Sequence, residues 1–315
     1  MSRIETLESA DEDRNTAAYN WEYLRHEYPN ITLIREDVRN YDELKKIIKG
    51  HDAVVHTAGQ VAVTSSLDDP RTDFEVNTLG TFNVLEAART VKSDPAVVVA
   101  STNKVYGGNV NEVAVREEET RFVYDDPEYE SGIPETLSID DCEHTPYGVS
   151  KLAADQYVQD YAIRGEVDAA AFRMSCIYGP RQFGNEDQGW VAHFAISVLE
   201  NEPLTIFGNG KQVRDVLYVE DLIRAYDAFL ENPEGKPAVY NIGGGPEHTT
   251  SLIEFLDLLS EVTGSECEIE FDEWREGDQR VYISNISRAR DHLNWRPRTD
   301  LKTGINRFVE WYSDR

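Results

Sequence analysis

AVVVASTNKVYGG at residues 96–108 and TPYGVSKLAADQYVQDY at residues 145–161 are the stretches that decide the fold. The first begins as a short run of Val and Ala and passes into Ser, Thr and Gly, which is typical of a buried strand ending at a polar turn. The second predicts a helix over residues 146–164. A strand, a Ser/Thr exit, an insertion and then this helix form an ordered set that is hard to reach by chance.

The same alternation of short apolar runs and helical patterns continues outward along the chain. Strands rich in Val and Ala and separated by helices imply an α/β protein with a doubly wound parallel sheet. The predicted strands are 31–34, 53–56, 96–100, 169–174 and 238–242. The predicted helices are 41–49, 73–90 and 146–164. The acidic, turn-rich segment 109–144 is expected on the surface between the two deciding stretches.

Tyr147 and Lys151 lie four residues apart in the predicted helix, so their side chains share one face. A free Tyr titrates near a pKa of ~10, too high for a general base at neutral pH, and a neighbouring ammonium lowers that pKa. Thr102, at the strand exit, can offer its hydroxyl to the same substrate oxygen. Together these groups could remove a proton from a carbinol while a hydride leaves its carbon. The alternative is a half-buried packing tyrosine, which the bare spacing does not exclude.

Further motifs give the chain a family resemblance over nearly its whole length. They are HTAGQ (56–60), NTLGTFNVLEAAR (77–89), STNKVYGG (101–108), TPYGVSK (145–151), FRMSCIYGPRQ (172–182), RDVLYVEDL (214–222) and NIGGG (241–245). In this order they resemble the extended short-chain dehydrogenase/reductases, the NAD-dependent nucleotide-sugar epimerases and dehydratases. TNKVYG together with YGPRQFGNEDQGW (178–190) is most similar to the CDP-tyvelose (CDP-paratose) 2-epimerases, as is the acidic insertion ending ETLSIDDCEH (135–144).

The resemblance implies a Rossmann-like domain that binds NAD and a smaller mixed lobe that binds the substrate. We expect residues 1–175 to form the first, with 213–247 returning to it, and residues 176–212 and 248–315 to form the second. Tyr147 would be the general acid/base, Lys151 would lower its pKa and bond the nicotinamide ribose, and Thr102 would orient the reacting hydroxyl. The remaining residues expected along the cofactor are Asp37, Val38, Ala58, Gly59, Gln60, Asn77, Met174, Ser175 and Cys176.

On the substrate side, the resemblance points to Asn103, Lys104, Gln182, Gln188, Arg214 and Arg275. The planar fork of arginine bonds two oxygens at once, which suits Arg214 and Arg275 to a diphosphate. Asp215, Glu220 and Asp221 are expected to brace the following helix, and Trp295 to anchor the packing of the C-terminal region.

Asn103 and Lys104 stand where dehydratases of this family carry Asp-Glu, the acid and base of water elimination, so 4,6-dehydration is disfavoured. The function expected is epimerisation of a nucleotide sugar, through oxidation of a ring carbinol and re-reduction of the ketone, at C2 of a CDP-sugar. The alternatives are a UDP-sugar 4-epimerase and a catalytically silent member acting as a binding module.

The silent alternative is motivated by the glycine-rich turn that should open a dinucleotide-binding sheet. No GxxGxxG precedes Asp37, and the opening MSRIETLESADEDRNTAAYNW resembles the loop that normally follows the second strand. FGNG (207–210) and GGG (243–245) match other turns of the family. The expectation is that the first βαβ portion is absent from this sequence, as a misplaced start codon would produce. A chain truly beginning at Met1 would bind the cofactor poorly.

The composition narrows the partners, metal sites and cellular locations that the chain can have. The 59 acidic residues outnumber the 31 basic ones and are spread along the chain, for a net charge of −28. This indicates a salt-adapted, halophilic surface and disfavours binding to nucleic acids or anionic membranes. Cys142, Cys176 and Cys267 are widely separated, which favours reduced thiols over a metal site. With no signal peptide and no apolar run of ~20 residues, we expect a cytoplasmic enzyme, and the resemblance implies a homodimer through helices 73–90 and 146–164.

Overall fold

The main feature of the computed structural model, which describes residues 16–275 and 277–315, is a parallel four-stranded sheet. Its strands are β1 (Ala53–His56), β2 (Ala96–Thr102), β5 (Ala169–Met174) and β9 (Val239–Ile242), in the order β1-β2-β5-β9. Residue Val98 of β2 pairs with Val55 of β1 and with Ala170 of β5. Four of the five predicted strands are therefore confirmed, with bounds that differ by no more than two residues.

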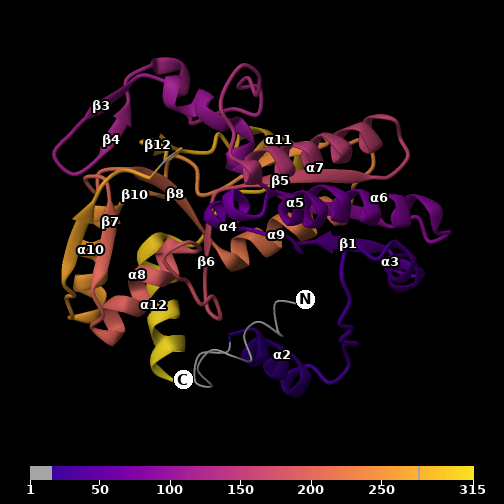
Figure 1. Cartoon of the computed structure of the whole chain (residues 1–315), viewed down its shortest axis with the longest axis horizontal. Coiled ribbons are helices and arrows are strands. Elements are labelled where there is room, and N and C mark those ends of the chain that lie inside the picture. Colours follow the sequence, from indigo (N-terminus) through magenta and orange to yellow (C-terminus); the bar gives the residue numbers. More distant parts are fainter. Residues whose placement is uncertain (1–15, 276) are drawn as a thin grey trace.

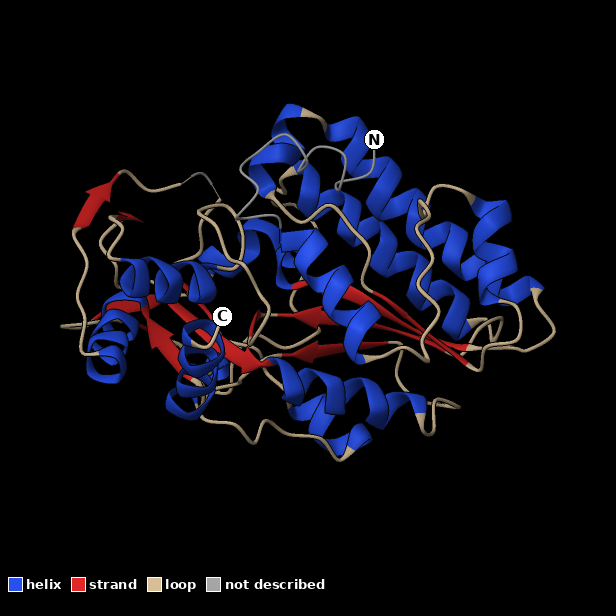
Figure 2. Cartoon of the chain, turned by 90° about the horizontal axis from the view of Figure 1, so that it is seen from below, coloured by secondary structure: helices blue, strands red, loops and turns tan. Residues whose placement is uncertain are grey.

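Helices cover both faces of this sheet, as Figure 2 shows. Val97 and Val99 of β2 point to one face, where they pack with α3 (Tyr41–Ile48), α6 (Gly80–Thr90) and α7 (Pro146–Ile163). Val98 points to the other face, where it packs with α9 (Val219–Leu230) and α11 (Ser287–Leu293). Because successive side chains of a strand alternate between faces, a run of Val and Ala that is apolar throughout fits a sheet buried on both sides. The predicted doubly wound fold is confirmed.

Two predictions at the N-terminal end are wrong. Residues 31–34 form no strand, and Ile31 and Ile34 are exposed, because no neighbouring strand of the described chain supplies them with hydrogen-bond partners. Within the opening stretch predicted as a loop, residues 16–21 belong to helix α2 (Thr16–Glu27), whose Tyr19 meets Phe183 edge to face. The remainder, residues 1–15, lies outside the described part of the chain.

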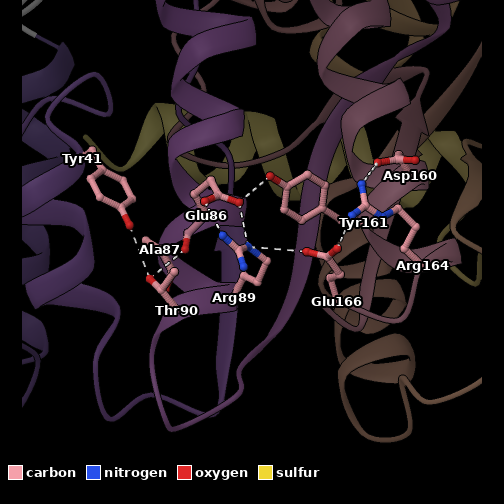
Figure 3. A network of polar contacts seen from close by, with 9 residues as sticks. All are labelled: Tyr41, Glu86, Ala87, Arg89, Thr90, Asp160, Tyr161, Arg164 and Glu166. Carbon is pink, nitrogen blue, oxygen red and sulfur yellow. Dashed lines mark hydrogen bonds and ion pairs between the residues drawn. The ribbon is translucent and has the colours of Figure 1, made fainter.

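The helix predicted over residues 73–90 is one rod with an internal irregularity. It consists of α5 (Pro70–Phe74), a π-helical turn η2 (Glu75–Leu79) and α6, and it is preceded by α4 (Val63–Asp68). At the far end of α6, Glu86 accepts hydrogen bonds from Arg89 and from Tyr161 of α7, the latter at 2.5 Å (Figure 3). This network fastens the two helices together at the end of the sheet away from the site described below.

A second group of strands lies beside the main sheet (Figure 1). β8 (Val213–Tyr218) pairs with β6 (Cys176–Tyr178), β10 (Thr249–Ser251) and β12 (Val281–Tyr282), while β7 (Leu204–Phe207) pairs with β11 (Ile269–Asp272). Helices α8 (Trp190–Glu200), α10 (Leu252–Thr263) and α12 (Leu301–Ser313) pack on this group. The predicted smaller mixed lobe corresponds to it. The residue division into two domains stays a prediction.

The acidic segment 109–144 is more than a surface excursion. It includes part of the 3-10 helix η3 (Asn103–Glu112), the hairpin β3 (Val115–Glu117) and β4 (Phe122–Tyr124), and the 3-10 turn η4 (Pro127–Tyr129). Its Val110, Val113 and Ile133 are buried in a core of their own with Tyr282 of β12. The segment therefore joins the main sheet to the second group of strands.

Of the three residues expected to brace the following helix, Glu220 and Asp221 join α9 to other segments, whereas Asp215 does not contact that helix through its hydrogen bonds. Asp215 is buried and accepts hydrogen bonds from Ser175 and the Gly245 amide. Asp221 is buried at the start of α9 and accepts from the amides of residues 298 and 299, while Glu220 pairs with Arg307 on the surface. Trp295 is buried and donates to the Asp221 carbonyl at 2.8 Å, so its predicted packing role is confirmed. Among the described residues, no helix has the length and apolar character that crossing a bilayer requires.

Candidate active site

A cavity of about 550 Å³ opens at the carboxyl ends of β2 and β5, between the main sheet and the second group of strands. This is the edge at which parallel α/β sheets bind ligands. The predicted site residues that line it are Gly59, Thr102, Asn103, Lys104, Tyr147, Lys151, Met174, Ser175, Cys176, Gln182, Gln188, Arg214 and Arg275. The fold thus brings together residues spread over most of the chain.

The three predicted catalytic side chains meet at one end of the cavity. Helix α7 begins there, with Thr145 accepting a hydrogen bond from the Gly148 amide and Pro146 in the first turn, so Tyr147 and Lys151 fall on consecutive turns. Thr102 is the last residue of β2, and its side chain is close enough to Tyr147 to lower the pKa of the phenol. All three side chains are buried. The arrangement can hold a ligand hydroxyl between a threonine and a tyrosine hydroxyl.

The electrostatics of this group differ from expectation. Burial raises the pKa of Tyr147 to about 12, although the Thr102 hydrogen bond lowers it in part. Burial also lowers the pKa of Lys151 to about 8. The Lys151 ammonium donates to the Ala100 carbonyl at 2.5 Å, and the pKa of Tyr147 is set by burial, Thr102 and Asp73, so the lowering expected from Lys151 stays a prediction. Loss of solvation dominates because both groups sit beneath the sheet edge.

A buried charge network that sequence reasoning missed supports these side chains. Asp155, one turn beyond Lys151, receives both Nε and Nη2 of Arg173 at 3.0 and 2.9 Å and the hydroxyl of Ser101 at 2.7 Å. Asp155 and Arg173 are at most 3% exposed. Since Ser101 precedes Thr102 and Arg173 lies on β5, the network ties α7 to two strands at the catalytic end. The charges of Asp155 and Arg173, on a helix and strand predicted as buried, were the available signal.

The π-helical turn η2 organises the neighbouring loop. Its buried Asn77 accepts from the Gln60 amide at 2.9 Å and donates to the Gln60 carbonyl, Asp73 and Ser150. Asn77, expected along the cofactor, thus holds the loop that contains Gly59 and Gln60. A side chain at Gly59 would place a Cβ 3.0 Å from the Asn77 oxygen and 3.8 Å from the Lys151 amine. The loop is therefore held close over Lys151, and π turns of this kind are frequent at functional sites.

The residues predicted along NAD divide into two sets. Gly59, Met174, Ser175 and Cys176 line the cavity next to Lys151, so they fit the nicotinamide half of a dinucleotide. The others lie outside the cavity: Asp37 is exposed and paired with Arg39, Val38 packs on Gly80, and Ala58 and Gln60 belong to the loop that Asn77 holds. Within the described chain, no glycine-rich strand-to-helix turn is present to cradle a pyrophosphate.

At the far end of the cavity, both predicted arginines are paired with carboxylates. Arg214 donates to Asp278 at 2.6 Å. Arg275 donates to Glu186 at 2.9 Å, and its guanidinium lies over the Phe207 ring at 3.8 Å. Gln188 lines the same end, in an exposed turn closed by backbone bonds with Asn185. A diphosphate bound here would compete with these carboxylates for the arginine forks.

Lys104 and Gln182 lie between the two ends. The Lys104 amine has one hydrogen bond, to the Gly277 carbonyl at 3.4 Å, and burial lowers its pKa. Asn103 bonds Thr102 and Gln279, both weakly, at 3.3 and 3.4 Å. Gln182 donates to the Ile177 carbonyl, which leaves its buried Oε1 without a partner.

The cavity also contains residues that sequence reasoning missed. Gln212 donates from Nε2 to the Phe207 carbonyl at 2.7 Å, so its buried Oε1 is left as an acceptor without a partner. Trp190 donates to the Cys176 sulfur at 3.1 Å and forms part of the wall with His193. FGNG (207–210) was interpreted as a turn of the family, and the signal for Gln212 was its position between this turn and Arg214. The described residues contain no group of His, Cys, Asp or Glu arranged to hold a metal ion.

Comparison with known proteins places this geometry in context. The model of the NAD dependent epimerase/dehydratase family matches residues 10–243. A CDP-paratose 2-epimerase of Salmonella typhi is 39% identical over 90% of this chain and 85% of its own length. A putative UDP-glucose 4-epimerase of Methanocaldococcus jannaschii is 33% identical, over 90% and 84%. The solved structure of a Thermotoga maritima UDP-glucose 4-epimerase with UDP-glucose superposes with a TM-score of 0.73 at 26% identity, covering 95% of both chains.

Proposed function

The chain belongs to the NAD-dependent epimerase/dehydratase family, and from this premise we propose that it inverts C2 of the sugar in a CDP-sugar of the paratose type. The observation that carries the proposal is the meeting of Thr102, Tyr147 and Lys151 at one end of a cavity that has two arginines at the other. The similarity to a CDP-paratose 2-epimerase supports the substrate. A nucleotide sugar has a matching order: a carbinol-bearing ring, then a diphosphate, then a nucleoside.

The three side chains would act on the reacting hydroxyl in sequence. Thr102 and Tyr147 hold its oxygen, and Tyr147 takes its proton while the carbon becomes a ketone. The phenol must ionise for this step, and its pKa of about 12 in the unliganded chain opposes ionisation. Lys151 is the nearby cation that can lower this pKa once its ammonium turns from the Ala100 carbonyl. NAD, when bound, accepts and returns the hydride.

The far end of the cavity would hold the nucleotide while the ring turns over. Arg214 and Arg275 would bond the diphosphate, and the free Gln212 Oε1 would accept from a hydroxyl of the ribose. The ketone could then present its other face and receive the hydride and the Tyr147 proton on that side. Asn103 and Lys104 place no carboxylate beside Thr102, which favours this redox cycle over elimination of water.

Product analysis tests the proposal. The protein is incubated with NAD and either CDP-paratose or UDP-glucose in molar KCl, and the sugars are identified by NMR. We expect inversion at C2 of the CDP-sugar and no reaction of UDP-glucose. Inversion at C4 of UDP-glucose instead would replace the proposal by the second candidate, which the 33% identical archaeal relative favours.

Titration calorimetry with NAD separates an enzyme from a silent member. Since the described chain has no glycine-rich pyrophosphate turn, binding by this chain is the decisive property. Stoichiometric binding supports the epimerase, whereas a folded chain that binds no NAD would be a binding module.

We also propose a homodimer formed through helices 73–90 and 146–164, that is, through the end of α5, η2, α6 and α7; Figure 1 shows α5 and α6 beside α7. Phe74 and Val149 are each 53% exposed, and Leu79 and Tyr157 are exposed as well, so these helices present an apolar face. Light scattering should give twice the chain mass, and Val149→Asp should give a folded monomer.

The acidic surface and the absence of a membrane-crossing helix in the described chain support a cytoplasmic, salt-adapted enzyme, whose melting temperature should rise with KCl.

A further inference from the structure

Lys104 is the cation of the cavity that lacks an anionic partner and a strong hydrogen bond. Arg214 and Arg275 are each paired with a carboxylate, and Lys151 donates to a carbonyl at 2.5 Å. Among the described residues, the Lys104 amine reaches only the Gly277 carbonyl, at 3.4 Å. In a chain with nearly twice as many acidic as basic residues, an unpaired amine in a cavity points to an anionic group of the ligand.

The position of Lys104 links it to the reacting end. Its backbone amide donates to the Thr102 hydroxyl at 3.2 Å, at the point where β2 ends and η3 begins. Its carbonyl lies 3.1 Å from where a Cβ of Gly148 would stand, so its backbone also packs against the first turn of α7, next to Tyr147. The backbone of Lys104 is therefore fixed at the reacting end, while its amine reaches the Gly277 carbonyl, where the charges that act on it are those of Asp278, Arg214 and Cys176.

The chemistry of nucleotide sugars gives this position a meaning. The phosphate is attached through oxygen to C1, the anomeric carbon. C2 is bonded directly to C1, whereas C4 lies on the opposite side of the ring. A cation between the reacting hydroxyl and the two arginines can bind the phosphate when the reacting carbon is C2. When C4 reacts, the phosphate points away from that hydroxyl.

We propose that Lys104 binds the phosphate attached to the sugar and thereby places C2 of the ring at Thr102 and Tyr147. The proposal deepens the 2-epimerase function and rests on it. Arg214 and Arg275 then hold the rest of the diphosphate, so the ketone stays anchored next to the carbon at which it formed.

Nucleotide titrations test the position of Lys104 without turnover. CMP has only the phosphate next to the ribose, while CDP also has the one that would carry the sugar. Lys104→Met should weaken CDP binding about tenfold, or about 1.4 kcal/mol, and change CMP binding less than twofold. Lys104→Arg should restore most of the lost CDP affinity. The control is Lys302→Met on α12, where Lys302 forms an exposed pair with Glu261, and it should change neither the CDP nor the CMP affinity.

Each alternative outcome is decisive. Equal losses for CMP and CDP, or no loss for either, would overturn the assignment of Lys104 to the sugar phosphate. If the methionine variant melts lower than wild type, Lys104→Gln carries the same comparison, since its amide keeps a polar side chain without the charge.

Deuterium in the substrate tests the position of C2. Deuterium at C2 of the CDP-sugar should slow turnover and deuterium at C4 should not. The reverse pattern would overturn the placement of C2. If no sugar nucleotide turns over, the proposed function fails, while the CMP and CDP titrations still decide what Lys104 binds.

Discussion

The two ends of the cavity are built on different principles. At the reacting end, Thr102, Tyr147 and Lys151 are buried on a strand and a helix, and the Asp155–Arg173 pair braces them from behind. At the nucleotide end, Arg214 of strand β8 is paired with Asp278, and Arg275, outside the helices and strands, is held by Glu186, whose side chain is 58% exposed. The difference teaches that the chemistry is set by rigid elements, whereas the recognition of the nucleotide is set by ion pairs that a ligand can exchange.

The largest expected effect is a loss of turnover at the reacting end. Tyr147→Phe removes the hydroxyl that carries the proton, so turnover should fall by about 10³-fold, while the melting temperature and nucleotide affinity stay near wild type. Steady-state assays, thermal melts and CDP titrations measure the three quantities. Near-normal turnover would refute the assigned mechanism.

The next variant removes the buried ion pair between Asp155 and Arg173, which does not line the cavity. Asp155→Ala leaves Arg173 charged and buried without its partner, which costs about 3–5 kcal/mol of stability for a pair of this kind. Denaturant unfolding should show the loss. Asp160→Ala, at an exposed pair with Arg164 on the same helix, is the control and should change stability little. Equal stabilities of the two variants would show that the buried network contributes nothing.

Acid should also act on the reacting end. His56, buried at the end of β1 and bonded to Thr81, has its pKa lowered by burial from 6.5 to about 3. Between these values the unfolded chain binds a proton that the folded chain does not, so stability rises with pH across this window and is lost on acidification. The loss from this group is about 1.4 kcal/mol per pH unit below 6.5. His56→Gln should reduce the slope of the free energy of unfolding against pH by this amount. An unchanged slope would contradict the assignment of this pH dependence to His56.

The smallest expected effect is a change of CDP affinity at the nucleotide end. Glu186→Gln removes the carboxylate that competes for Arg275, so CDP should bind about threefold more tightly, the scale of an exposed ion pair. Asp125→Asn, at the exposed pair with Arg116 outside the cavity, is the matched control. Weaker binding in Glu186→Gln would mean that the carboxylate positions Arg275 for the ligand instead of competing with it.

The same contrast explains what the sequence could predict. β2 and α7 follow from local patterns, and the ends of parallel strands meet at one edge, so the clustering of Thr102 with Tyr147 and Lys151 was predictable. The carboxylate partners of Arg214 and Arg275 arise from contacts between distant segments, which spacing does not encode. Gln212 was missed for a different reason, since its bond to Phe207 is local and the FGNG turn beside it was interpreted as structural. Residues 31–34 have a strand composition, but a strand needs a neighbour, and composition does not report one.

At the nucleotide end, the counter-ions of the two arginines are carboxylates of the protein itself, and a bound phosphate would take their place. A ligand phosphate that replaces Asp278 on Arg214, or Glu186 on Arg275, displaces a fixed carboxylate and releases no salt ion from the arginine. Sites that bind phosphate on unpaired cations lose affinity steeply as salt rises, because ion release drives their binding. Phosphate binding by these two arginines should therefore depend only weakly on salt, which would help an enzyme with so acidic a surface to hold its substrate at high ionic strength.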